Sequence, residues 1–213
     1  MGEMQGQTWL GNASLFLGMW VPMMAAMMLP SLVPMLWRYR QAVAGTDGMR
    51  LEWLTALAGM GYFFIWTMVG VAVYPVGVAL SAIEMRQPAL ARAVPFAVGL
   101  VVLIAGSLQL TTWKARRLAC CSDVPGRGRT LPADARTAWR TGLHLGLHCG
   151  QCCAGLMTIA LVIGIMDVRV MAVVGAAITA ERLAPAGLRV ARAIGAVVVG
   201  AGFLLIARAA GFA

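Results

Sequence analysis

Five residues that can bind a soft metal ion lie within ten positions of a single hydrophobic segment. They are His144, His148, Cys149, Cys152 and Cys153. On a helix, His144, His148 and Cys152 share one stripe, and Cys149 and Cys153 share the stripe beside it. Polar side chains in a membrane helix lack water and need partners. Two imidazoles and three thiols on adjoining stripes therefore favour a shared metal ion.

The same segment carries a glycine at every fourth residue, at Gly142, Gly146 and Gly150. Small residues at this spacing let a second helix approach closely. On the helix this strip borders Cys149 and Cys153. We therefore expect a close-packed helix to bring further ligands to the cysteines.

A methionine-rich segment near the N-terminus offers such ligands. On a helix Met19, Met23 and Met27 stack on one face, with Met24 and Met28 beside them. Thioether and thiolate sulfurs select Cu(I) over harder ions. The sequence thus predicts a Cu(I) site with primary ligands Cys149, Cys152 and Cys153 and supplementary ligands His148, His144, Met23, Met27 and Met28.

Other interpretations of these residues stay open. Methionine and cysteine also serve as apolar packing. Cys149 and Cys152 form a Cys-x-x-Cys pair that suits a membrane thiol–disulfide oxidoreductase, and the glycine strip suits a structural subunit of a larger complex. Zinc also binds Cys and His ligands, but structural zinc sites usually lie in a polar or soluble setting, so zinc is the weaker alternative. Covalent haem attachment needs Cys-x-x-Cys-His, which is absent, although His144 or His148 can bind haem without attachment.

Six hydrophobic segments must position these residues. They span residues 15–37, 53–80, 94–113, 141–166, 168–184 and 188–207. A membrane helix needs about 20 mostly apolar residues, and no strand-like alternation competes. We predict an all-α polytopic transmembrane bundle in one domain, residues 1–213. The fifth segment is the weakest, because it crosses only if Arg169 and Arg182 reach outward at its ends. A half-membrane hairpin is its alternative.

Composition agrees with a membrane protein. Hydrophobic residues make up 61% of the 213 residues and charged residues only 12%, whereas soluble domains carry about 25% charged residues. The net charge of +9 comes from basic residues between hydrophobic runs, which indicates a topology signal rather than nucleic-acid binding.

The distribution of basic residues predicts the orientation. Most of them follow the first, third and fifth segments, so these loops, including the polar loop 114–140, should be cytoplasmic. Both termini then lie outside a bacterial inner (cell) membrane. The N-terminal seven residues contain Glu3 and no basic residue, unlike a cleaved signal peptide, so we expect the first segment to be retained.

Several further residues have two open roles. Cys120 and Cys121, in the polar loop, are either a transient metal-exchange site or free thiols. Tyr62, one turn from Trp66, is expected to pack. Glu181, at a helix end, is expected to pair with Arg182 or another arginine, or to approach the metal site, because acidic groups near lipid need partners.

At these residues the chain resembles the predicted metal-binding integral membrane proteins, a family of unknown function in which some members are labelled copper chaperones. The most specific match is Gly142-x3-Gly146-x2-Cys149-x2-Cys152-Cys153-x3-Met157. Further matches are Met19-Trp20, the run from Ala26 to Ser31, Gly61-Tyr62 with Trp66, Gln109 with Lys114, Cys121 and Pro125, Gly164-x-Met166, and Glu181.

The resemblance implies copper or metal handling, with a periplasmic or cytoplasmic metal donor or acceptor protein as partner. The chain departs from the family pattern in its loop cysteines. Arg117 takes the place of the first one, and Cys120 is shifted to sit beside Cys121. Ala154 replaces an aromatic residue, and His144 and His148 lie outside the pattern.

Overall fold

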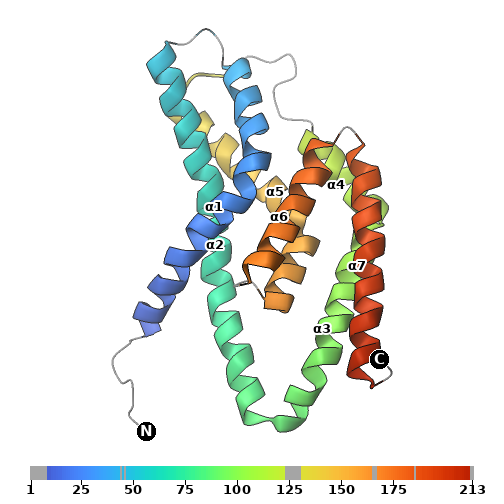
Figure 1. Cartoon of the computed structure of the whole chain (residues 1–213). Helices are drawn as coiled ribbons and strands as arrows, with labels where there is room; N and C mark the ends of the chain where they lie inside the picture. The colour runs from blue at the N-terminus through green and yellow to red at the C-terminus, as the bar shows by residue number, and fades with distance from the viewer. Residues whose placement is uncertain are drawn as a thin grey trace.

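The described residues of the chain form seven α-helices and no strand (Figure 1). A computed structural model describes residues 9–43, 45, 47–122, 131–164, 167–184 and 186–211. The helices are α1 (Trp9–Ala42), α2 (Gly48–Arg86), α3 (Pro88–Gln109), α4 (Thr112–Ser122), α5 (Ala135–Gly164), α6 (Val168–Leu183) and α7 (Gly187–Ala209). The predicted all-α class is therefore confirmed for this part of the chain.

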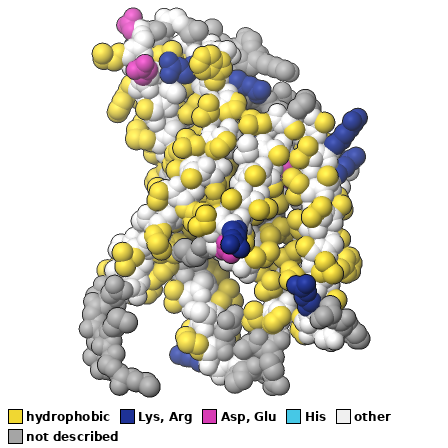
Figure 2. Space-filling view, in the orientation of Figure 1, with side chains coloured by type: hydrophobic (Ala, Val, Ile, Leu, Met, Phe, Trp, Pro, Cys, Tyr) yellow, Lys and Arg dark blue, Asp and Glu magenta, His cyan; other side chains and the backbone are white. Residues whose placement is uncertain are grey.

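Four of the helices, α1, α2, α5 and α7, are long and apolar enough to cross a membrane. The apolar part of α3, Ala93–Gln109, is shorter, and α6 has 16 residues. Hydrophobic side chains cover most of the visible side of the molecule, and Lys and Arg side chains gather mainly near its upper end (Figure 2). Such continuous exposed apolar surface is typical of a lipid-facing or partner-facing protein.

Most helices begin or end at other residues than the predicted segments, and two of these differences have a clear cause. The third segment was expected to reach residue 113, but α3 ends at Gln109. The chain turns there, with the Leu110 and Thr111 amides donating to the Ser107 and Leu108 carbonyls, and it restarts as α4. The α5 helix begins before the predicted segment, at Ala135, because an Asp134 carboxylate accepts from the Thr137 amide, 3.0 Å away, and caps it. Hydropathy marks only the apolar part of a helix.

Glycines bring α5 against α2. A Cβ built on Gly142 would overlap the Ala58 carbonyl, and one on Gly146 would lie 3.0 Å from the Tyr62 carbonyl oxygen. Gly150, by contrast, has nothing within 4 Å. The close approach predicted for the glycine strip thus occurs at two of its three positions. The helix that packs on this strip is α2, and the contact places Tyr62 of α2 next to α5.

Gly142→Ala should lower the free energy of unfolding by about 1–3 kcal/mol, because the added methyl group has no room beside the Ala58 backbone. Gly150→Ala is the matched control on the same helix. It fills open space, so it should be neutral or stabilising by up to about 1 kcal/mol. Unfolding of the two purified variants in detergent checks this. Equal effects would show that α2 and α5 are not in contact at Gly142.

The helices α3 and α7 form a second close pair. Gly106 of α3 faces the Val199 amide, and Gly202 of α7 faces the Leu103 backbone, each at 2.9 Å from a built Cβ. Gly195 of α7 packs against the Gln109 side chain. This pair fixes the position of Gln109 at the end of α3.

Candidate metal centre

The Cys149 thiol lies at the meeting point of α1, α2, α5 and α6. Its side chain is fully buried. The Sγ atom lies 3.8 Å from the Met28 Sδ atom of α1 and accepts a hydrogen bond of 3.0 Å from the Tyr62 hydroxyl of α2. It also accepts from Arg182 Nη1 of α6, at 3.0 Å. Four helices therefore position one thiol in the interior.

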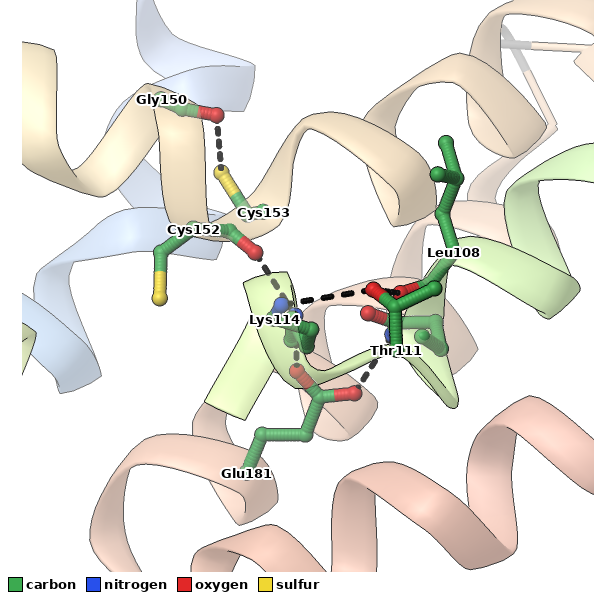
Figure 3. Close-up of polar contacts among 8 residues, drawn as sticks. Leu108, Thr111, Lys114, Gly150, Cys152, Cys153 and Glu181 are labelled. Atoms are coloured by element: carbon green, nitrogen blue, oxygen red, sulfur yellow. Dashed lines mark hydrogen bonds and ion pairs between the residues drawn. The ribbon is translucent and has the colours of Figure 1, made fainter. Parts of the chain in front are cut away.

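Cys152 and Cys153 are also buried, and all three thiols of α5 are free. Cys153 follows Cys149 by one helical turn on the same stripe of α5, and the two thiols lie close enough to interact electrostatically. The Cys153 thiol also lies 3.8 Å from the Gly150 carbonyl oxygen. In Figure 3 the sulfur atoms of Cys152 and Cys153 point in different directions. The thiol pair that meets in the interior is therefore Cys149 with Cys153.

The methionine that reaches the thiols is Met28. The predicted stack of Met19, Met23 and Met27 does not face them as one row. Met19 is 54% exposed and Met23 is half-buried. Met27 is buried but faces α6, where its Cγ atom lies 3.5 Å from a Cβ built on Gly175. Helical periodicity identified the sulfur-rich helix but not which of its adjoining stripes turns inward.

The two histidines are less buried than the three thiols. His144 is exposed and His148 is half-buried, and their rings stack with centroids 6.2 Å apart. Among the described residues, no group of three or more His, Cys, Asp or Glu side chains is arranged to hold a metal ion. The convergent donors of this structure are instead two thiols and one thioether, which are ligands suited to a soft monovalent ion.

A buried ion pair lies directly against the cysteine turn. The Lys114 Nζ atom lies 2.7 Å from Glu181 Oε2 and donates a 2.6 Å hydrogen bond to the Cys152 carbonyl oxygen (Figure 3). The Gln109 amide donates to Glu181 Oε1 at 2.7 Å. The side chains of Lys114 and Glu181 are only 3% exposed. This network joins α3, α4, α5 and α6 around the Cys152 backbone.

The network bears on two predictions. Glu181 was expected either to pair with an arginine or to approach the metal site; its partners are Lys114 and Gln109, beside the Cys152 backbone. Lys114 was assigned to a polar loop, yet it lies on α4 and is buried. The reason is that a carboxylate and an ammonium group can both be buried when they pair with each other. The two residues are far apart in the sequence, so the residues around each one do not indicate its partner.

A crossing by the fifth segment was expected to require an outward Arg182, and the structure does not show that orientation. The Arg182 Nη1 atom donates to Ser31 Oγ at 3.1 Å as well as to Cys149, and Nη2 lies 3.9 Å from the Met35 Sδ atom. The side chain thus points into the bundle, where a thiol and a hydroxyl accept its hydrogen bonds. Arg169, at the other end of α6, is exposed as expected.

Sequence reasoning assigned no role at this site to Gln109, Lys114 or Tyr62, although all three are among the residues that match the family pattern. The structure places each of them beside the cysteine turn. Glu181 was named as a residue that could approach the metal, whereas Arg182 was expected only at the end of its segment. The side chains of Cys120 and Cys121, and the whole of Pro125 and Met166, lie outside the described residues.

Comparison with known proteins gives one match. No curated protein and no solved structure is significantly similar to the chain. A family described as "PpoB2: Copper chaperone" matches residues 17–205, which include at least part of all seven helices and every residue of the site described above. The chain therefore belongs to the PpoB2 copper chaperone family.

Proposed function

We propose that this chain is an integral membrane chaperone that binds Cu(I) at Cys149, Cys153 and Met28 and delivers it to a partner protein. The observation that carries the proposal is the meeting of these sulfur atoms in the buried core, with Cys149 and Met28 only 3.8 Å apart. Cys152 is the adjacent thiol and can serve as an additional ligand. His144 and His148, on the outer side of α5, act at most as transient ligands.

The membrane arrangement in this proposal has six crossings in a bacterial inner membrane. The four long apolar helices support it, and α3 and α6 supply the other two. At 1.5 Å per residue α6 spans about 24 Å, less than the hydrocarbon thickness of about 30 Å. A crossing was expected to require that Arg182 reach outward. In this proposal α6 crosses with Arg182 inside the bundle instead, where Ser31 and Cys149 accept its hydrogen bonds. The start of α1 and the end of α7 lie towards one end of the molecule (Figure 1), in agreement with both termini outside.

Ligand exchange is the proposed mechanism. Along α1 the methionines become more exposed towards the N-terminal end, from Met28 and Met24, which are fully buried, through the half-buried Met23 to the exposed Met19. Each thioether can take over the ion before the previous sulfur releases it, so Cu(I) is never left bare in an apolar interior. Met19, near the N-terminal end that this proposal places outside, then exchanges the ion with a periplasmic metal donor or acceptor protein.

Metal counting tests the proposal. The full-length protein is purified in detergent under reducing conditions, loaded with Cu(I), and its copper measured after removal of excess metal. We expect bound copper in the wild type and none in the Cys149/Cys152/Cys153→Ser triple variant. A Cys120/Cys121→Ser variant, which removes the two thiols of α4, is the control and should keep its copper. Full copper retention in the triple variant would show that the site lies elsewhere.

A further inference from the structure

Arg182 places a positive charge directly on the thiol pair. Its guanidinium donates to the Cys149 Sγ atom at 3.0 Å and is held in place by Ser31 and by contact with Met35. A thiolate sulfur has several lone pairs, so it can accept this hydrogen bond and bind a metal ion at the same time. Groups that hydrogen-bond to a ligand orient it and tune the bound metal.

The charge of the bound complex depends on the metal. Two thiolates with Cu(I) carry a net charge of −1, whereas two thiolates with Zn(II) are neutral. In an interior of low dielectric constant, a guanidinium a few ångströms away stabilises the anionic complex but gains little from the neutral one. This difference acts whatever other contacts the guanidinium makes.

We propose that Arg182 is a specificity-determining residue that makes the Cys149–Cys153 pair prefer monovalent over divalent soft metal ions. The inference rests on the proposed function, because it assumes that these thiols bind the metal. It goes further in assigning the choice of ion to a charge on α6 and not to the sulfur ligands alone. Sulfur ligands also accept Zn(II), so they do not discriminate sufficiently by themselves.

The test compares metal affinities of the full-length protein by competition with chromogenic chelators. Cu(I) and Zn(II) have equal numbers of d electrons, as do Ag(I) and Cd(II), so each pair differs chiefly in charge. Arg182→Gln should weaken Cu(I) and Ag(I) binding about 100-fold and leave Zn(II) and Cd(II) binding unchanged or stronger. Arg182→Lys, which keeps the charge, should retain most of the preference. Arg169→Gln, an exposed change on the same helix, should alter nothing.

A second pair of variants keeps Arg182 in place. Met35→Glu sets a carboxylate beside Nη2 and neutralises the guanidinium, so it should shift the preference towards divalent ions as Arg182→Gln does. Met35→Gln is its uncharged control and should not. Gel filtration shows whether Arg182→Gln folds. If it does not, the two Met35 variants still test whether the charge of Arg182 sets the metal preference.

The outcomes separate the two proposals. If the wild type binds no Cu(I), the proposed function fails. If it binds Cu(I) but Arg182→Gln and Met35→Glu leave the ratio of monovalent to divalent affinity unchanged, or weaken both classes equally, only the role of Arg182 is overturned.

Discussion

Glu181→Leu should lower the free energy of unfolding by about 3–5 kcal/mol, because it leaves the Lys114 ammonium buried without its carboxylate. Lys114→Met should lower the free energy of unfolding by a similar amount, because it leaves the Glu181 carboxylate buried without its ammonium partner. Both side chains are almost fully buried, so water cannot replace the missing partner. Reversible unfolding of the detergent-solubilised protein measures the effect.

A double-mutant cycle isolates the pair. The combined Lys114→Met and Glu181→Leu variant should be more stable than either single variant, because it removes both charges at once. Arg169→Met, at an exposed position of the same helix as Glu181, should stay within about 0.5 kcal/mol of the wild type. Additive losses in the double variant would mean that the two charges do not interact in the folded protein.

The largest effect on metal binding is expected from Cys149→Ser. This variant should bind Cu(I) more than about 100-fold less tightly, since even groups that only orient a ligand are worth about 10–100-fold. Of the three thiols of α5, Cys149 is the one that contacts Met28, Tyr62 and Arg182 together. Competition with a Cu(I)-specific chelator under reducing conditions gives the affinity.

Two other serine variants provide the comparison. Cys153→Ser should also weaken binding strongly, because its thiol lies one helical turn from Cys149 on the same stripe of α5 and is buried with it. Cys152→Ser should have a smaller effect, since the Cys152 contact with Lys114 is made by the backbone carbonyl, which serine keeps. A loss confined to Cys152→Ser would assign the metal to the other side of α5.

Sequence reasoning found the helices and the sulfur-rich segments because these depend on local properties. Apolar runs define the helices, and a spacing of four residues identified Cys149 with Cys153 and the close approach at Gly142 and Gly146. These features can be recognised without knowing which residues of other helices pack against the segment. The same is true of the methionine segment, which was found although its inward-facing stripe was not.

The remaining features depend on partners far apart in the chain. Lys114 and Glu181 can be buried only because they form an ion pair. The residues next to each of them in the sequence do not indicate this pairing. Arg182 was read as an outward-reaching end residue, as isolated arginines in membrane segments commonly are. Its inward position depends on acceptors on α1 and α5. The histidines were placed with the metal because of spacing alone, although His144 is exposed.

X-ray absorption of copper in the Cu(I)-loaded, full-length protein tests the central claim most directly. Coordination by Cys149, Cys153 and Met28 predicts a first shell of sulfur atoms only, and a His144/His148→Ala variant should give the same spectrum. Nitrogen ligands that disappear in that histidine variant, with no change in a Cys149/Cys153→Ser variant, would contradict the account and move the copper to the outer side of α5.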